Sequence, residues 1–345
     1  ACLNMDRMPL LRPPTSSQEP SEVTLDEILR AVRCDNAATL RRLNLQNHRL
    51  AAVPENIGSL AKLQVLNLRG NLLATLPDSL GQLRQLRTLD LRNNRLSALV
   101  EDIGQLGALA TLHLTENRLT TLPASIGRLS HLQTLGVSAN QLAALPGSIG
   151  ELAALQNLEV FMNCLTAVPE DIGQLAGLES LDLGSNELQQ LPEGIDQLTT
   201  LRLLSVRANQ LKSLPENFGC MPLLETLYLS CNLLSSLPES ISNLIALTTL
   251  HLWCNQLVEL PESLGRLSCL QTLQVYGNDL RALPESICNL GALRFLDVRS
   301  NKLERLPPRI GQLARLRTLD ARRNPFRELP ESLRLLQSRG ASVHY

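Results

Sequence analysis

Residues 178–192 read LESLDLGSNELQQLP, which is the pattern Leu-x-x-Leu-x-Leu-x-x-Asn-x-Leu-x-x-Leu-Pro. The pattern recurs along most of the 345-residue chain, and its asparagine returns every 23 residues. These markers are Asn71, Asn94, Asn117, Asn140, Asn163, Asn186, Asn209, Asn232, Asn255, Asn278, Asn301 and Asn324. One further step towards the N-terminus falls on His48, which makes thirteen units without insertion or deletion. A fixed period of this length indicates a solenoid, in which each unit packs only against its neighbours.

Each unit contains a predicted strand, a turn and a return. Leu181 and Leu183 alternate with Ser180, Asp182 and Gly184, so the leucines face one side of a short strand and the other residues face the opposite side. We therefore predict an α/β leucine-rich-repeat solenoid of about 13 repeats of 23 residues, a curved horseshoe with a parallel sheet on its concave face. The asparagine column is predicted to be a structural ladder, because an amide side chain offers donors and an acceptor to the backbone of adjacent turns.

The N-terminal residues are expected to differ from the repeats. Residues 1–20 contain four prolines and are expected to form a flexible leader. Residues 21–39 are predicted to hold a capping helix, in which Thr24 and Glu27 form a capping box. Such a helix would cover core and strand edge that the first repeat leaves open.

The solenoid itself is predicted over residues 40–336, followed by a C-terminal tail at residues 337–345. Leu333, Leu335 and Leu336 are expected to close the far end of the core, because terminal repeats of a solenoid act as caps. One elongated domain is expected over this range.

The composition restricts the class of protein. Aromatic residues make up 2% of the chain, so leucine and isoleucine must form nearly all of the core. The chain has no apolar run of the roughly 18 residues that span a membrane. Its eight cysteines are scattered and do not form paired clusters at the ends, which favours a reducing, cytoplasmic compartment, with association with the cytoskeleton as a further possibility.

Charge is unevenly distributed along the chain. Residues 30–95 carry eleven Lys and Arg and four Asp and Glu. Between Arg128 and Arg202 there are nine acidic residues and no Lys or Arg, whereas residues 291–340 hold twelve basic and five acidic residues. Two interpretations stay open: drift on solvated surfaces, or electrostatic complementarity to a partner, which aids encounter and orientation.

The candidate binding surface consists of the side chains six, four and two residues before each asparagine, which are expected to be exposed on the concave face. Five of the eight aromatic residues fall there, while Phe218 and Phe326 occupy predicted core positions. The predicted protein-binding residues are Phe161, Tyr228, His251, Trp253, Tyr276, Phe295, Arg299, Arg322, Glu159 and Asp182. Large aromatic side chains are typical interface anchors. The alternative is that these rings fill space on a curved sheet.

The charges around these aromatic residues suggest an oriented interface. Glu159 and Asp182 precede the aromatic group along the chain, and Arg299, Arg322 and Arg323 follow it. An aromatic patch about 15 Å across, flanked by opposite charges, would penalise a reversed pose of the partner.

Acidic and arginine residues are also paired two residues apart, so that both side chains lie on one face of a strand. The pairs are Asp90 and Arg92, Asp297 and Arg299, and Asp320 and Arg322. We expect solvated ion pairs that contribute little stability. The alternative is that they present arginine forks to a carboxylate or phosphate of a partner.

For an enzyme, the best candidate group is His251 with Cys231 and Cys254. A cysteine–histidine nucleophile needs a third residue that orients the base, and none is evident. A zinc site needs three or four ligands, which this group does not supply. We therefore expect no catalysis, no metal and no cofactor. Binding of nucleic acid is not expected either, because the basic ends lack aromatic stacking platforms.

Two segments, LPESI at residues 283–287 and LPGSIGEL at residues 145–152, extend the pattern around the asparagine. With it they resemble the 23-residue class of leucine-rich repeat found in plant intracellular Ras-group proteins, Ras-pathway scaffolds and the repeat regions of Scribble and Erbin. The resemblance covers residues 40 to about 336. It implies an intracellular, non-enzymatic signalling scaffold that binds proteins through the concave face, in some cases a small GTPase or a phosphatase subunit. The alternative function is a structural subunit of a large cytoskeletal or axonemal assembly.

Overall fold

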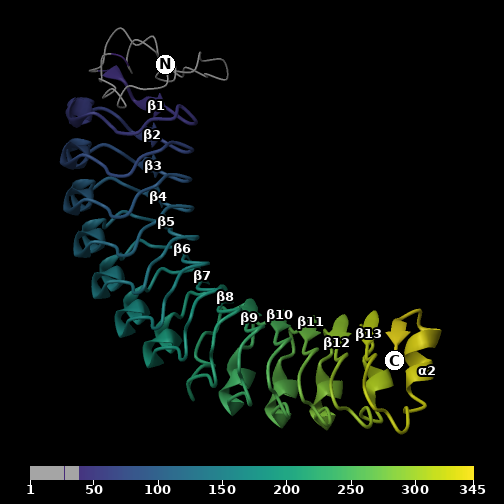
Figure 1. The fold of residues 1–345 in the computed structure, drawn as a ribbon. Helices are drawn as coiled ribbons and strands as arrows, with labels where there is room; N and C mark the ends of the chain where they lie inside the picture. Colours follow the sequence, from purple (N-terminus) through teal and green to yellow (C-terminus); the bar gives the residue numbers. More distant parts are fainter. Residues whose placement is uncertain (1–26, 28–38) are drawn as a thin grey trace. The chain divides into compact units, whose positions relative to one another are not determined.

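The computed structural model of the chain describes residue 27 and residues 39–345 (Figure 1). The chain divides into two units between residues 165 and 166. The predicted leader and all but Glu27 and Thr39 of the predicted capping segment lie outside the described residues. In the described part of the chain, no helix combines the length and the apolar character needed to cross a membrane.

The first unit contains a parallel sheet whose strands follow the chain order. Its strands are β1 (Arg42–Asn44), β2 (Val65–Asn67), β3 (Thr88–Asp90), β4 (Thr111–His113), β5 (Thr134–Gly136) and β6 (Asn157–Glu159). Neighbouring strands pair with a shift of 23 residues, so that Leu66 stands beside Leu43 on one side and Leu89 on the other. The period of the sequence is therefore the register of the sheet.

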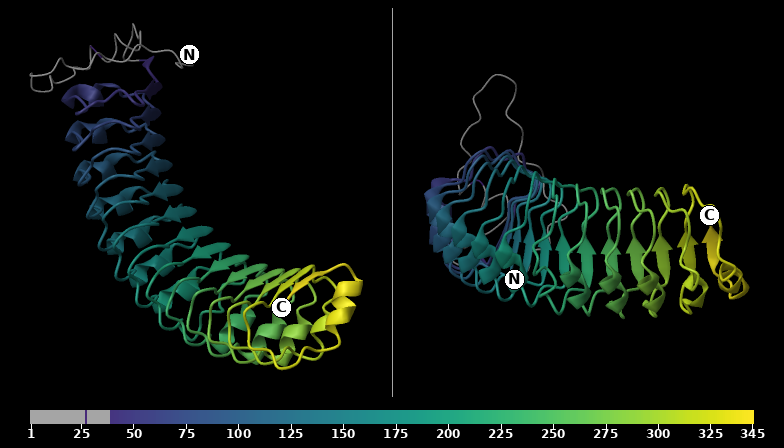
Figure 2. Two further views of the ribbon diagram at one scale, coloured as in Figure 1. Left: turned by 45° about the vertical axis from the view of Figure 1, so that its right-hand side comes forward. Right: turned by 90° about the horizontal axis from the view of Figure 1, so that it is seen from below.

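The second unit repeats this arrangement. Its strands are β7 (Ser180–Asp182), β8 (Leu203–Ser205), β9 (Thr226–Tyr228), β10 (Thr249–His251), β11 (Thr272–Gln274), β12 (Phe295–Asp297), β13 (Thr318–Asp320) and β14 (Ser342–His344). In both units the strands line one side and short helical turns line the opposite side (Figure 2).

The return segments are mostly 3₁₀ helices that begin after a Leu-Pro pair. They are η2 (Glu55–Ser59), η3 (Asp78–Gln82), η4 (Glu101–Gln105), η5 (Ala124–Arg128), η6 (Gly147–Glu151), η7 (Glu170–Gln174), η8 (Glu193–Gln197), η9 (Glu239–Asn243), η10 (Glu262–Arg266), η11 (Glu285–Asn289) and η12 (Ile310–Gln312). The proline fixes an extended entry, as at Pro192 with φ −66° and ψ 151°. The apolar residue of each helix then turns inward, and Ile195 is fully buried.

The core is a column of aliphatic side chains in each unit. Leu181, Leu183 and Leu188, the leucines of the defining stretch, are 0% exposed. The aromatic exception is Phe218, which is also fully buried, as predicted. A parallel sheet with leucines on one side and short helical turns on the other confirms the leucine-rich-repeat solenoid of about 13 repeats.

The marker asparagines lie inside the turns that follow the strands. Asn209 is 8% exposed, and its amide nitrogen donates to the carbonyl oxygens of Leu183 and Val206, both at 3.0 Å. Its amide oxygen accepts a hydrogen bond from the backbone nitrogen of Leu188 at 3.0 Å. Each such side chain therefore satisfies backbone groups that the departing strand leaves unpaired.

The residue immediately before each marker asparagine adopts a left-handed backbone conformation. Among these residues are Ala139 (φ 52°), Cys254 (φ 54°) and Arg323 (φ 57°). Their backbone nitrogens continue the ladder beyond the strand, as in the 2.9 Å bond from Cys254 to the carbonyl of Tyr276. This turn follows the strand and leads directly into the buried marker asparagine, such as Asn140 or Asn255.

The C-terminal segment differs from the sequence prediction in three respects. Helix α2 (Leu333–Ser338) buries Leu333 and Leu336, but Leu335 is 39% exposed and does not close the core. Gly340, at φ 80°, ends the helix, and the predicted tail then supplies strand β14, which pairs with β13. The third difference is Phe326, which is half-buried and not in the core.

Candidate functional site

The sheet face of the second unit is defined by the side chains six, four and two residues before each marker asparagine. The column four residues before the marker runs Tyr228, His251, Gln274, Asp297 and Asp320. The column two residues before the marker runs Ser230, Trp253, Tyr276, Arg299 and Arg322. The expectation that all these positions are exposed is wrong, because most are half-buried and Ser230, Asp297 and Asp320 are buried. Side chains of neighbouring columns therefore shield one another from solvent.

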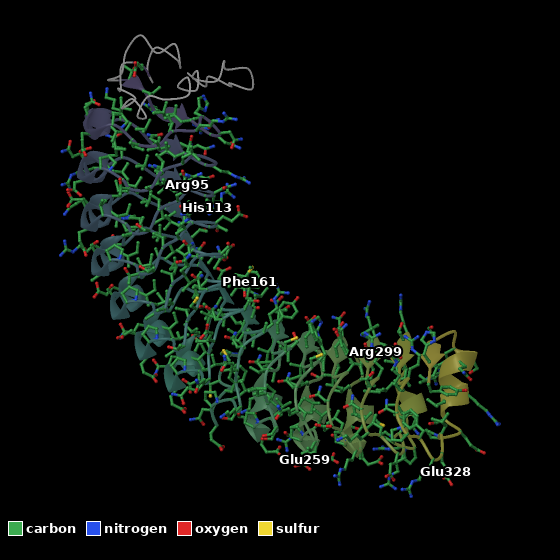
Figure 3. The ribbon with its side chains drawn as sticks, in the orientation of Figure 1. Arg95, His113, Phe161, Glu259, Arg299 and Glu328 are labelled. Atoms are coloured by element: carbon green, nitrogen blue, oxygen red, sulfur yellow. The ribbon has the colours of Figure 1, made fainter. Side chains whose placement is uncertain are left out.

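An aromatic stack, formed by Trp253, Tyr276 and Arg299, occupies three successive repeats. The rings of Trp253 and Tyr276 are stacked, with centroids 5.3 Å apart and planes at 4°. The guanidinium carbon of Arg299 lies 4.5 Å from the centre of the Tyr276 ring, and Figure 3 places Arg299 on the strand side. Stacking and cation–π contacts hold these large side chains in one arrangement before any partner arrives.

A second ring contact lies beside this stack. The rings of Tyr228 and His251 have centroids 4.9 Å apart and are tilted by 58°. Burial lowers the pKa of His251, which therefore presents a neutral imidazole at neutral pH. Phe295 lies in the column six residues before the marker, where Thr272 and Thr318 are its neighbours in the sheet.

The acidic and arginine pairs are not solvated ion pairs, because their carboxylates are buried. Asp320 is 6% exposed and receives two hydrogen bonds from Arg322, one from Nε at 2.9 Å and one from Nη2 at 2.6 Å. Asp90 and Arg92 repeat this two-point contact in the first unit. Asp90, Asp297 and Asp320 each lie four residues before a marker asparagine and are buried. The arginine two residues later contacts the carboxylate in each pair.

The pKa values of the three carboxylates shift in different directions although all three share the Asp-x-Arg-x-Asn pattern. Burial raises the pKa of Asp90, but hydrogen bonds from Arg92 outweigh it and the pKa is lowered overall. The side-chain hydrogen bond from Arg322 lowers the pKa of Asp320 despite its burial. Burial dominates at Asp297, whose pKa is raised. There Arg299 makes a single 3.2 Å contact and also faces Asp320 at 3.9 Å.

A hollow of about 680 Å³ opens at the C-terminal end of the aromatic stack. Its lining includes Tyr276, Gly277, Arg299, Arg322 and Arg323. Gly277 has φ 66° and no side chain, so it leaves the space between Cys254 and the arginines open. We name this feature the arginine hollow. Three of its lining residues are arginines and one is a tyrosine.

The remaining predicted binding residues, Glu159, Phe161 and Asp182, belong to earlier repeats. Phe161 and Glu159 belong to the first unit, where Glu159 is exposed and Phe161 is half-buried on the strand side (Figure 3). Asp182 ends β7 and is half-buried, with its carboxylate accepting a hydrogen bond from the backbone of Gly184 at 2.9 Å. The structure thus brings together Tyr228 with His251, and Trp253, Tyr276 and Arg299 with Arg322.

The candidate nucleophile group has the wrong electrostatics for its chemistry. Burial raises the pKa of the Cys231 thiol, and the neighbouring Cys254 raises it further. A nucleophilic cysteine needs a lowered pKa. The ring of His251 lies against Tyr228, and burial lowers its pKa. These two shifts oppose formation of a thiolate–imidazolium pair.

Sequence reasoning missed two features of the site. One is the burial of Asp297 and Asp320, which the alternation of strand residues had assigned to solvent. The other is the arginine hollow, which depends on the left-handed turn at Gly277 and Arg323. A small or polar residue before every marker asparagine except Asn163, which follows Met162, was the available signal for that turn.

Two family models match the chain, and both describe leucine-rich repeats. The family described as "leucine-rich repeat region" matches residues 78–166 and 229–302, and the family described as "leucine rich repeat" matches residues 38–96 and 199–257. A search among curated proteins finds no match.

Solved structures also match the chain. A leucine-rich-repeat protein of Leptospira interrogans is 32% identical, with 92% of this chain and 86% of that chain covered and a TM-score of 0.75. A TDR receptor is 29% identical with a TM-score of 0.79, and the match covers 91% of this chain but 57% of that one. An internalin, InlF of Listeria monocytogenes, is 23% identical over 93% of this chain and 88% of that chain, with a TM-score of 0.77, and shows the fold alone.

Proposed function

Because the chain belongs to the leucine-rich-repeat family, we propose that it is a non-enzymatic scaffold that binds another protein through the sheet face of its second unit. The observation that carries this proposal is the aromatic stack of Trp253, Tyr276 and Arg299. Aliphatic side chains, mainly leucines, form almost all of the core. The rings of Trp253 and Tyr276 are therefore not needed to pack it. One structural relative is itself named a receptor, which supports a binding role.

The physical case rests on preorganisation. An interface anchor contributes most when its side chain is large and loses little freedom on binding. Trp253 and Tyr276 are half-buried and already stacked, so a partner would meet a rigid apolar surface with a charged end. Scaffold proteins use such surfaces without any chemical step.

The test is capture of binding proteins from cell extract by the full chain and by the double variant Trp253→Ala, Tyr276→Ala. We expect capture to fall at least about tenfold, because each anchor is of the type that contributes 2 kcal/mol or more. The thermal midpoint should change little, since neither residue belongs to the core. A matched control is Val258→Ala with Ile245→Ala, which removes two exposed side chains (52% and 62%) that are not in the three columns of the sheet face.

A further control separates binding from folding. Leu250→Ala changes a fully buried leucine on the same strand as His251 and should lower stability by about 2–5 kcal/mol. If the double variant captures the same proteins at full strength, the sheet face of the second unit is not the binding surface.

By resemblance to the 23-residue class, we further propose that this scaffold acts in intracellular signalling in the cytoplasm. A small GTPase or a phosphatase subunit is the candidate partner on the same ground. Mass spectrometry of the captured proteins tests this finer proposal, and capture of other classes alone would reject it.

A further inference from the structure

We propose that the arginine hollow binds an oxyanion carried by the protein partner, either a carboxylate or a phosphoryl group. This inference rests on the proposed function, because it assigns one chemical group of the partner to one place on the sheet face. The hollow is lined by Arg299, Arg322 and Arg323 beside Tyr276. Arginine is the residue best suited to bind planar or tetrahedral oxyanions through paired N–H groups.

The charges of the hollow do not cancel. Asp297 and Asp320 are buried and form ion pairs with Arg299 and Arg322, so two carboxylates neutralise two of the three arginines that line the hollow. Arg323 makes no hydrogen bond or ion pair with any described residue. One arginine of the lining therefore has no acidic partner among the described residues, in a stretch of chain where basic residues outnumber acidic ones.

The arginines are also oriented before an anion arrives. Arg322 uses Nε and one hydrogen of Nη2 for Asp320, which leaves three of its five N–H groups free to bind. Arg299 is held between the Tyr276 ring and Asp297. Because these side chains are fixed, binding an oxyanion costs less conformational entropy than it would with mobile arginines.

The first unit provides a matched internal control. Arg92 contacts Asp90 with the same two hydrogen bonds, but the residue that follows it is Asn93, where the hollow has Arg323 after Arg322. If an acid-bound arginine sufficed for anion binding, Arg92 would bind as well as the hollow. Anion binding is therefore assigned to Arg299 and Arg322, which aspartates hold in place, acting together with Arg323.

The test is titration of the full chain with sodium phosphate and, separately, with sodium acetate at constant ionic strength. The readout is the fluorescence of Trp253, the single tryptophan of the chain, which stacks on Tyr276 next to Arg299. We expect a saturable change with at least one of the two anions. Saturation by phosphate would indicate a phosphorylated partner, and saturation by acetate alone would indicate an acidic side chain or a chain terminus.

The variant Arg323→Gln should weaken the apparent affinity by about three- to tenfold, as expected for loss of one charge-assisted contact. Arg92→Gln should leave the titration unchanged. The inference is overturned if neither anion gives saturation with the wild-type chain, or if Arg323→Gln titrates like wild type. This test needs no partner protein, so its failure is distinct from failure of the aromatic stack to capture one.

Discussion

At the scale of single residues, one sequence pattern produces two electrostatic outcomes. Asp90 and Asp320 each receive two hydrogen bonds from the arginine two residues later, and their pKa values are lowered. Asp297 has the same pattern, but Arg299 contacts the Tyr276 ring and Asp320 as well, so burial dominates and the pKa is raised. Sequence predicted the pairing, and it could not predict how one arginine is shared among three neighbours.

This difference predicts opposite effects of the same substitution. Asp320→Asn and Asp90→Asn should each lower the free energy of unfolding at pH 7 by about 1–2 kcal/mol, because a charge-assisted contact is lost. Asp297→Asn should leave stability equal or higher, because the asparagine oxygen can still accept the backbone hydrogen bond of Arg299 while the buried charge is removed. Urea denaturation midpoints of the three variants at pH 7 provide the measurement.

The pH dependence has a defined sign for each carboxylate. The folded pKa of Asp320 lies below its ordinary value, so its stabilising contribution is present above that ordinary value and is lost as pH falls through the folded pKa. The folded pKa of Asp297 lies above its ordinary value, so its charge is a penalty at neutral pH that disappears on acidification. Equal destabilisation by Asp297→Asn and Asp320→Asn at pH 7 would contradict this assignment.

At the scale of elements, the 23-residue period was enough to predict the strands, their parallel order and their register. The period could not predict that β14 forms from residues 342–344, because this strand pairs with β13 at a step of 24 residues and lacks the leucine pattern. The exposed edge of β13 recruits it through backbone hydrogen bonds, which depend little on side-chain identity.

The asparagine ladder gives the element-scale prediction. Asn209→Ala removes the acceptor of the Leu188 amide and the donor to the carbonyls of Leu183 and Val206. Each buried backbone group left without a partner costs about 1–3 kcal/mol, so we expect a clear drop in the urea midpoint. Asn243→Ala, at an exposed position of η9, is the control and should be neutral. Equal midpoints for the two variants would show that the ladder does not stabilise the turns.

At the scale of the whole molecule, the repeated backbone is nearly uniform and the function must come from side chains that depart from the repeat. In the second unit these departures are Tyr228, His251, Trp253, Tyr276 and Arg299. The sequence placed them on one face, and ring contacts join Tyr228 to His251 and Tyr276 to both Trp253 and Arg299. Phe161 and Glu159 belong to the first unit, and their part in the same binding surface stays a prediction. The position of a residue within the 23-residue period predicts its repeat and its column on the sheet. It does not predict which side chains contact one another.

The most direct measurement is photo-crosslinking from two positions of the full chain. Gln274→p-benzoylphenylalanine places the probe on the sheet face between His251 and Asp297, and Glu259→p-benzoylphenylalanine places it at an exposed position on the opposite side (Figure 3). We predict that a protein from cell extract is crosslinked at residue 274 and not at residue 259, and that Trp253→Ala with Tyr276→Ala abolishes the crosslink. Crosslinking at residue 259 alone, or crosslinking at residue 274 that survives loss of both aromatic side chains, would contradict the proposal that this face binds the partner.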